Sequence, residues 1–544
     1  MDKAVRDTRG AWWGAVVIGG GALWLAGFLF ARWPAPLFAN FNSNSPIDAA
    51  FFAWAGQAVR HGGTPYLTFW DHKPPLVFLI DAGALSISAG RVWGIWLVSL
   101  ATLVATLVLG YAAMRRLFAT AGTPGAAFGA VAFAASVPAI MPSNLTEQYV
   151  LPLEMGALLV FARAREAPHR SLGAGFALGV LGGLSFMLRQ NLFGAELIAA
   201  VVLAWLMLRA AGAGAVLRLI MGGVLGALAV MLPIVLWLWA RGALGAFYDQ
   251  AFHYNNLYTA VSVKARVRAA YDGLRMATGT LPLVVPLAGW LLAARRLVRG
   301  GGPADRATLL LAIAWLPLEL ALASVSGRAY AHYFATLLPP LALLSGYLVA
   351  EIAAALAPSV LRAAALVGAL GAALAIPVAL DLAVSLRADG LPRARAAQVA
   401  AVAGYVRRTT APDARVLVWG HAADVLLLSD RRPASRFVYP LPLLTPRYAD
   451  SALVASFLAD LRASDPPVII DATPNAPPGD DLVPSLGTWN PGWRYPPAAT
   501  GSGSTSRAWW HMTPALHAFY DYVSAHYVLA DSIGPERWAV YRLR

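Results

Sequence analysis

The sequence predicts a polytopic α-helical membrane protein with a small α/β domain at its C-terminal end. Of its 544 residues 58% are hydrophobic and only 13% are charged, whereas soluble domains carry about a quarter charged residues. Apolar stretches of roughly 18 to 22 residues recur up to about residue 385, and a helix of that length can cross a bilayer. After residue 390 the pattern changes to short strands alternating with helices, which is typical of an α/β domain.

The distribution of Lys and Arg predicts the orientation. Lys3, Arg6 and Arg9 precede the first apolar stretch and place the N-terminus in the cytoplasm, because cytoplasmic loops carry an excess of basic residues. We expect this stretch to be a retained helix, since it is too long for a signal-peptide core and no small-residue cleavage site follows it. About eleven spans are expected, with the C-terminus outside. They are 11–31, 92–113, 124–142, 147–163, 172–188, 192–208, 219–240, 278–295, 307–325, 333–350 and 361–384.

One apolar segment is expected not to span. Residues 74–88, PPLVFLIDAGALSIS, are short for a span and include Asp81. If this segment crossed the membrane, Arg115 and Arg116 would lie outside and every later loop would be inverted. We therefore expect an interfacial helix on the outer surface, within a long external loop at 32–91.

The chain is expected to divide into a transmembrane domain, 1–389, and an extracytoplasmic α/β domain, 390–544. The second domain should contain strands at Val416–Trp419 and Val468–Asp471 and a last strand in RWAVYRLR, preceded by a helix over 513–532. Residues 473–508 are rich in Pro, Gly and Ser, and we expect a long irregular insertion there.

Charge and cysteine content exclude several classes of function. The net charge is +14, but the basic residues are scattered in short clusters, so we expect no nucleic-acid partner. The chain has no cysteine, which excludes disulfides, thiolate metal sites and a cysteine nucleophile.

Ionisable side chains at membrane depth are costly and mark candidate functional sites. The topology brings ten of them, from separate loops, to the outer surface. They are Asp48, Asp71, His72, Lys73, Arg91, Glu147, Arg189, Lys264, Arg328 and His332. Glu154, Glu196 and Glu319 lie deeper, as polar contacts between helices or as cavity walls.

The first external loop is open to two interpretations. Asp48 in SPIDAAFF is either a first-turn acid that stabilises a helix start or a general base at the water boundary. Lys73 in DHKPP either extends along apolar surface to water or forms an anion site at the start of the proline-initiated helix.

The same ambiguity applies to the later loops. Glu147 is either a first-turn acid or a second catalytic carboxylate. Arg189 and Arg328 either reach to the interface at the ends of spans or clamp a phosphate with their planar guanidinium groups. His332 and Tyr333 would add hydrogen-bond donors.

The first loop resembles that of a known family. One span followed by the pattern D-x-x-x-F, G-x-x-P-Y and D-H-K-P-P-L resembles the GT-C glycosyltransferases, in the branch of the protein O-mannosyltransferases and the bacterial lipid A aminoarabinose transferase. HYFATLLPPLALLSG resembles bacterial members as well, and the resemblance covers about residues 11–385. It implies a GT-C fold and an inverting hexosyl- or pentosyltransferase that uses a polyprenyl-phosphate-linked sugar, with a glycan, lipid or protein acceptor, at the outer face of the bacterial inner membrane.

The resemblance also implies roles for residues. Asp48 matches the family's catalytic first-loop aspartate, and Lys73 matches the lysine of its E-K-P-P-L segment, where Asp71 and His72 replace the neighbouring acid. Many relatives carry Asp-Glu in this loop, but Ala49 follows Asp48 here. No cofactor is therefore expected, a divalent metal is possible but not favoured, and Glu147 is the expected second acid. The expected donor-phosphate ligands are Lys73, Arg189, Arg328, His332 and Tyr333, supported by Asp71, His72 and Tyr66.

Two alternatives remain open at this stage. The loop at 241–277 is long enough for a transferase of the O-antigen-ligase type, which holds its key residues in a late external loop. A lipid or solute transporter is the alternative from another class, although no internal repeat of the kind common in transporters is found.

Overall fold

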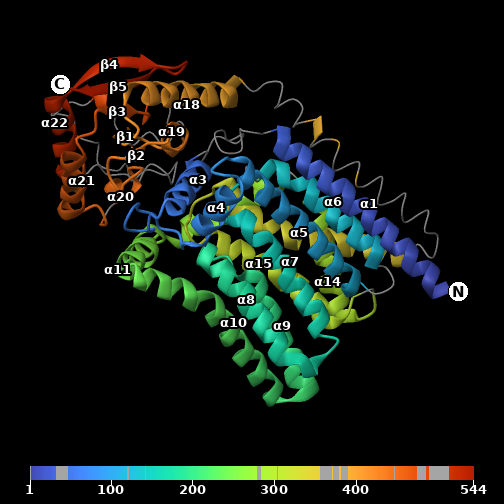
Figure 1. The fold of residues 1–544 in the computed structure, drawn as a ribbon. Helices are drawn as coiled ribbons and strands as arrows, with labels where there is room; N and C mark the ends of the chain where they lie inside the picture. The colour runs from blue at the N-terminus through green and yellow to red at the C-terminus, as the bar shows by residue number, and fades with distance from the viewer. Residues whose placement is uncertain are drawn as a thin grey trace.

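The computed structural model describes residues 2–31, 47–118, 122–140, 143–278, 283–302, 304–355, 371, 376, 379–380, 390–445, 447–473, 485–488 and 514–544. A long helical bundle makes up the first part of the chain, and a small sheet domain lies at one end of it (Figure 1). These two parts are the ones that the sequence predicts.

The bundle is built from ten helices among the described residues. They are α1 (Asp2–Ala31), α5 (Trp93–Leu117), α6 (Gly122–Ile140), α7 (Thr146–Ala164), α8 (Ser171–Leu188), α9 (Gly194–Ala211), α10 (Ala213–Ala240), α14 (Val284–Arg299), α15 (Arg306–Ala323) and α16 (Leu338–Ala355). Six helical segments within the described ranges are long and apolar enough to cross a membrane. They are Trp93–Leu117, Pro168–Leu188, Gly194–Ala211, Ala213–Ala240, Arg306–Ala323 and Ala331–Ala355.

The class of polytopic membrane protein is thus confirmed, whereas the count of eleven spans is not. The apolar parts of α1 and α6, Gly14–Leu29 and Thr123–Pro138, are shorter than a full span. Helix α7 is long, but Glu147 and Glu154 make it less apolar. Helix α14 begins later than the span expected at 278–295, and most of 361–384 lies outside the described residues.

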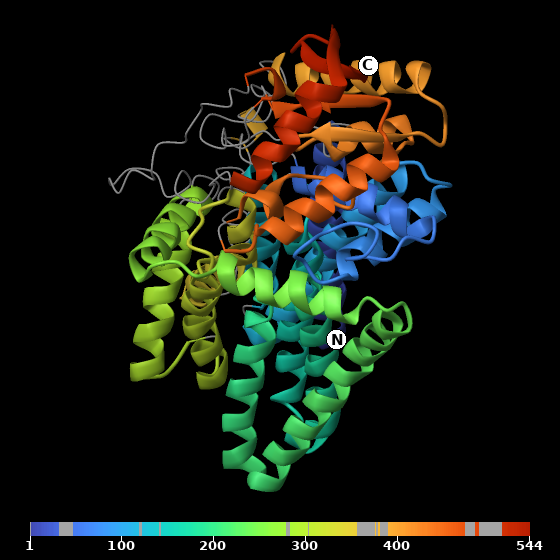
Figure 2. The same cartoon turned by 90° about the vertical axis from the view of Figure 1, so that its left-hand side faces the viewer.

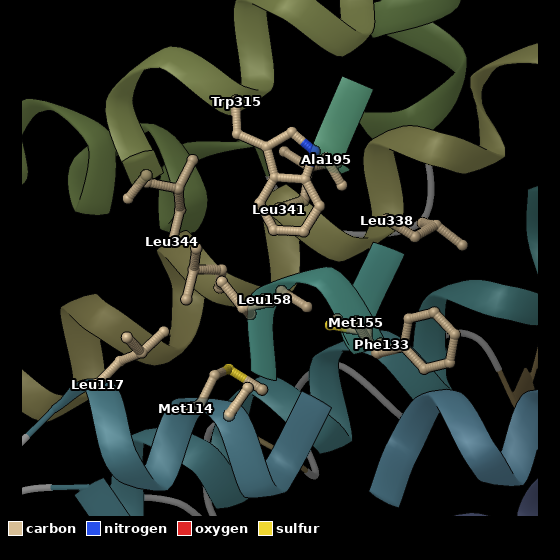
Figure 3. Close-up of a cluster of buried hydrophobic side chains, with 14 of the residues drawn as sticks. Met114, Leu117, Phe133, Met155, Leu158, Ala195, Trp315, Leu338, Leu341 and Leu344 are labelled. Carbon is tan, nitrogen blue, oxygen red and sulfur yellow. The ribbon is translucent and has the colours of Figure 1, made fainter. Parts of the chain in front are cut away.

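Large apolar side chains from several helices meet in the centre of the bundle. Figure 3 shows Trp315 of α15 beside Leu341 and Leu344 of α16, with Met114 of α5 and Met155 of α7 nearby. All five side chains are at most 2% exposed. Helices α8 and α10 pack through glycine instead, since a Cβ at Gly179 would overlap the Gly223 carbonyl oxygen. Small residues let membrane helices approach this closely.

The loop between α1 and α5, which we call the first loop, contains two short helices, α3 (Ile47–Arg60) and α4 (Leu76–Ile87). The 12 residues of α4 are too few to span a membrane, in agreement with the expectation for 74–88. Asp81 of α4 is buried, and its Oδ2 accepts a hydrogen bond from Asn144 Nδ2 at 2.9 Å. Asp81 therefore fixes α4 to the bundle rather than facing water.

The later loop at 241–277 is also folded. It consists of α11 (Leu244–Tyr248), a π-helical turn η3 (Asp249–His253), α12 (Tyr254–Tyr258) and α13 (Val263–Thr278). A further short helix, η4 (Ala331–Leu337), leads into α16. These segments lie next to the first loop, so they help to build the site described below.

The C-terminal domain is a five-stranded mixed sheet with helices. Its elements are α18 (Gly390–Thr409), β1 (Arg415–Trp419), α19 (Ala423–Ser429), β2 (Arg432–Pro433), α20 (Leu441–Leu444), α21 (Ser451–Ser464), β3 (Val468–Asp471), α22 (His517–His526), β4 (Tyr527–Ile533) and β5 (Trp538–Leu543). The strand order is β2-β1-β3-β5-β4. Strand β1 is parallel to β2 and β3, whereas β5 is antiparallel to β3 and β4.

The expected strands at Val416–Trp419, Val468–Asp471 and the C-terminal segment are observed. The helix expected over 513–532 is wrong over its last six residues, because α22 ends at His526 and β4 follows. Strand β4 lies at the edge of the sheet and is largely exposed, so it lacks the apolar alternation that indicates a strand. Of the expected insertion 473–508, only Thr473 and residues 485–488 are among the described residues.

The sheet domain packs on the first loop. Figure 2 shows it covering α3 and α4 at one end of the bundle. Phe51 of α3 contacts Tyr439 of the sheet domain edge to face, with ring centroids 5.0 Å apart. One buried apolar cluster runs continuously through both segments, so the domain and the first loop share a core.

Candidate active site

The centre of the site is a carboxylate and a lysine from the two ends of the first loop. Asp48 lies in the first turn of α3, and Lys73 precedes the Pro74–Pro75 pair that leads into α4. Lys73 Nζ lies 3.4 Å from Asp48 Oδ2 and 5.1 Å from the centre of the Phe52 ring. The Lys73 side chain is 8% exposed and that of Asp48 is 25% exposed. The carboxylate therefore remains accessible while the ammonium group is largely buried.

Three side chains fix the position of Lys73. Its backbone N–H donates to Asp71 Oδ1 at 2.7 Å, and Tyr439 donates its hydroxyl hydrogen to Asp71 Oδ2 at 2.7 Å. Tyr66, whose φ of 72° is unusual for a residue with a side chain, donates its hydroxyl hydrogen to the Lys73 carbonyl at 2.8 Å. The supporting residues Asp71 and Tyr66 thus hold the lysine backbone from both sides.

His72 connects Lys73 to the later loop. Asn255 Nδ2 donates to the His72 carbonyl at 2.7 Å, and Asn255 Oδ1 lies 2.9 Å from His72 Nδ1. Since that amide oxygen only accepts, Nδ1 carries the ring hydrogen and Nε2, 3.3 Å from Lys73 Nζ, accepts from the ammonium group. Burial lowers the pKa of His72 well below its ordinary value, so the ring is neutral, as this arrangement requires.

The electrostatics favour an ionised pair. Burial raises the pKa of Asp48, but the surrounding groups, with Lys73 the largest contributor, outweigh burial and hold that pKa below its ordinary value. Burial also lowers the pKa of Lys73, but Asp48 and Asp71 outweigh it and the pKa is raised. Asp71 differs, because burial exceeds the effect of Lys73 and Tyr439 and raises its pKa to about 6.

A second ion pair lies beside the first. Arg189, directly after α8, forms a salt bridge with Glu147 in the first turn of α7, and Thr146 donates its hydroxyl hydrogen to the other Glu147 oxygen at 2.9 Å. The Arg189 guanidinium carbon lies 3.7 Å from the centre of the Tyr333 ring. Glu147 is the counter-ion of Arg189 here, and its role as a second catalytic acid stays a prediction.

His332 and Arg328 come from the segment between α15 and α16. His332 Nε2 lies 4.0 Å from Asp48 Oδ2. The Arg328 guanidinium stacks on Tyr258, 3.4 Å from the ring centre, and donates to the Tyr258 carbonyl at 3.1 Å. Tyr258 and Tyr333 have their hydroxyl oxygens 3.4 Å apart. Arg328 and Arg189 are thus joined through two tyrosines.

The structure therefore brings most of the predicted residues together. Arg91 and Lys264 are exposed and make none of these contacts. Glu196 Oε1 accepts from Ser185 Oγ at 2.9 Å, and Glu319 Oε1 accepts from Trp315 Nε1 at 3.2 Å. With Glu154 they are buried in the bundle and make none of the contacts described above.

Four contributors were not predicted. Gln250, Asn255 and Tyr258 come from the loop at 241–277, where Gln250 Nε2 donates to the Tyr66 carbonyl at 2.9 Å and its Oε1 accepts from the Asp71 N–H at 3.2 Å. The two asparagines in YNNLY were a weak signal that this loop contributes polar side chains to the site. Tyr439 had none, because it lies 368 residues from Asp71.

Within the described part of the chain, no three His, Asp or Glu side chains converge in a group that could hold a metal ion.

The fold defines the class: a polytopic helical membrane protein with a C-terminal sheet domain. The chain is similar to the crystal structure of ArnT from Cupriavidus metallidurans bound to undecaprenyl phosphate, with a TM-score of 0.55 and 17% identity over 76% of this chain and 85% of that chain. The apo structure of the same ArnT gives a TM-score of 0.53 and 16% identity with the same coverage.

These likenesses show that the chain has the fold of this ArnT, in agreement with the fold that the first-loop resemblance implied. No protein-family model matches the sequence, and a search of curated proteins gave no match.

Proposed function

We propose that this protein is an inverting glycosyltransferase of the inner membrane, which moves a sugar from a polyprenyl-phosphate carrier to a hydroxyl or amine acceptor at the outer face. The observation that carries the proposal is the Asp48–Lys73 pair, with an accessible carboxylate beside a largely buried ammonium group. The ArnT of the same fold was crystallised with undecaprenyl phosphate, which supports a carrier of this kind.

The donor side of the reaction needs cations. When the bond between the anomeric carbon and the phosphate oxygen breaks, its electron pair stays on the phosphate of the carrier. Lys73 would stabilise this charge directly, with Arg189, Arg328, His332 and Tyr333 as further donors. A phosphate is already a good leaving group, so no acid is needed to protonate it.

The acceptor side needs a base. Asp48 would take the proton of the acceptor hydroxyl or amine as that atom attacks the anomeric carbon from the face opposite the phosphate. In the free site Lys73 holds the pKa of Asp48 low. Once the donor phosphate shares the charge of Lys73, less of it acts on Asp48 and the carboxylate becomes a stronger base.

A transfer assay tests the proposal. The purified protein in nanodiscs is incubated with radiolabelled polyprenyl-phosphate sugars, one pentose-linked and one hexose-linked, and with extracted envelope lipids and glycans as acceptors. We expect labelled product with one of the donors. Proton-dependent uptake of solute by proteoliposomes, without consumption of any donor, would contradict the proposal and favour a transporter.

Tyr439→Phe is expected to raise the donor KM about tenfold with a smaller change in kcat. It removes the hydroxyl that donates to Asp71, and a hydrogen bond to a charged group contributes about 1.5–3 kcal/mol. Tyr527→Phe is the control, because that hydroxyl donates to the Pro466 carbonyl in the same domain. Equal kinetics in both variants would show that Tyr439 does not position Lys73.

Donor affinity is expected to fall as the pH drops below about 6. The pKa of Asp71 is raised to about 6 by burial, and protonated Asp71 is a poorer acceptor for the N–H of Lys73. The pKa of Asp48 is below its ordinary value, so Asp48 stays ionised throughout this range. The profile of kcat/KM should rise through pH 6 in the wild type.

The control for this profile is Asp71→Asn, in which the inflection near pH 6 should disappear. The stability of the wild-type fold should change with pH in the direction opposite to donor affinity, rising as the pH falls below 6. A carboxyl whose pKa is higher in the folded than in the unfolded state destabilises the fold at high pH, and the loss is relieved as pH falls from 6 towards 4. An inflection that persists in Asp71→Asn would assign it to another group.

A further inference from the structure

A cavity of about 530 Å³ lies between α3 and the sheet domain. Four arginines of the sheet domain line it: Arg415, Arg431, Arg432 and Arg436. Trp54 and Gln57 of α3 lie on the opposite wall. We call this space the arginine cavity. None of the residues assigned to the candidate active site lines it.

The arginine cavity has a strong excess of positive charge. No carboxylate of the described ranges forms a salt bridge with any of its four guanidinium groups. The one carboxylate on its wall, Asp430, accepts a hydrogen bond from Gln57 Nε2 at 3.0 Å. Like charges around one space repel each other, so an anion bound among them would stabilise the arrangement.

The guanidinium groups are held by neutral partners that leave their charge uncompensated. Arg431 donates to the carbonyls of Ser429 and Thr410, and Arg415 donates to the Pro433 carbonyl at 3.2 Å. Arg436 Nε is buried and has no hydrogen-bond partner within the described residues. The cavity is therefore lined by cations whose charge no described carboxylate neutralises.

The arginine cavity lies close to the candidate active site along α3. Gln57 follows Asp48 by nine residues in the same helix, which corresponds to about 13 Å at 1.5 Å per residue. On the other wall, the Arg436 carbonyl accepts a hydrogen bond at 2.9 Å from the N–H of Trp70, next to Asp71. The two places are therefore neighbours, and a molecule that contacts both has to pass around α3, because nine residues at 3.6 per turn set Asp48 and Gln57 on opposite faces of that helix.

We propose that the arginine cavity binds an anionic group, phosphate or carboxylate, of the acceptor, while a hydroxyl or amine of the same acceptor reaches Asp48. This rests on the proposed function and names the acceptor class: a glycan or glycolipid whose negative charge lies at least about 13 Å from the reacting group. The planar, doubly donating guanidinium group suits both phosphate and carboxylate.

Binding of paired probes tests this inference. The full-length protein in phosphatidylcholine nanodiscs is titrated with a fluorescent trisaccharide that carries one terminal phosphate and with the same trisaccharide without phosphate. The wild type should bind the phosphorylated probe at least about tenfold more tightly. Equal affinity for the two probes would overturn the inference.

Matched double variants locate the binding. Arg415→Gln/Arg432→Gln removes two charges from the cavity, whereas Arg407→Gln/Arg408→Gln removes two exposed charges of α18 outside it. The preference for the phosphorylated probe should be lost in the first variant and kept in the second. A similar loss in both would show a general charge effect and overturn the inference.

Two further arms separate other outcomes. If phosphatidylglycerol in the nanodisc displaces the phosphorylated probe from the wild type, the cavity binds lipid headgroups, and its assignment to the acceptor is overturned. Donor affinity is measured in every variant. If the protein binds the donor in a Lys73-dependent way but does not distinguish the two trisaccharides, only this inference is overturned. If it binds no polyprenyl-phosphate sugar, the proposed function itself is overturned.

Discussion

Asp48→Asn is expected to reduce sugar transfer by about 10²–10⁴-fold, the usual contribution of a positioned general base. The substitution keeps the size of the side chain but removes the carboxylate that accepts the acceptor proton. Donor binding should persist, because Lys73, Arg189 and Arg328 remain in place. Turnover and donor affinity of the purified variant, measured separately with a radiolabelled polyprenyl-phosphate sugar, check this prediction.

Asp272→Asn provides the matched control. Asp272 belongs to α13 and pairs with Arg268 at 2.8 Å, outside the candidate site, so its loss should leave transfer unchanged. A thermal unfolding curve is needed for both variants, since Asp48→Asn also leaves Lys73 with one counter-ion fewer. Wild-type turnover by a folded Asp48→Asn protein would remove Asp48 from the mechanism.

Lys73→Met is expected to raise the donor KM by about 10- to 100-fold, because a hydrogen bond between charged groups contributes about 1.5–3 kcal/mol. The kcat should fall as well, since the lysine also stabilises the charge that forms on the leaving phosphate. Methionine retains an unbranched side chain against Phe52, which lies 5.1 Å from the ammonium nitrogen. Steady-state kinetics over a range of donor concentrations separate the two effects.

Lys264→Met is the control for this substitution. It also removes one lysine charge, but Lys264 is exposed in α13. An unchanged donor KM in Lys73→Met would mean that the phosphate is bound elsewhere. Arg189 would then be the next candidate for binding the phosphate, although its salt bridge with Glu147 partly neutralises its charge.

The first loop was predictable because its chemistry is local in sequence. Asp48 and Lys73 lie only 25 residues apart, and the prolines after Lys73 fix where α4 begins. The prediction of an interfacial segment at 74–88 followed from its length and from the basic residues after the next span. Hydropathy and charge were sufficient for these features.

Contacts between distant segments were not predictable. Glu147 and Arg189 were both identified, but as an acid and a phosphate ligand rather than as partners, because their ion pair depends on the start of α7 meeting the end of α8. Tyr439 reaches Asp71 from a separate domain. Strand β4 was missed because an exposed edge strand carries little hydrophobic pattern.

The role of the sheet domain follows from these distant contacts. It shares a buried core with α3 and supplies the hydroxyl that holds Asp71, and it forms one wall of the arginine cavity. We therefore expect the domain to shape both the donor and the acceptor sides of the site.

The most direct measurement is an experimental structure of the protein with a bound polyprenyl-phosphate sugar. We expect the phosphate within hydrogen-bond distance of Lys73 Nζ and the anomeric carbon of the sugar turned towards the Asp48 carboxylate. A donor whose phosphate lies away from Lys73, with its sugar out of reach of Asp48, would contradict the proposed mechanism.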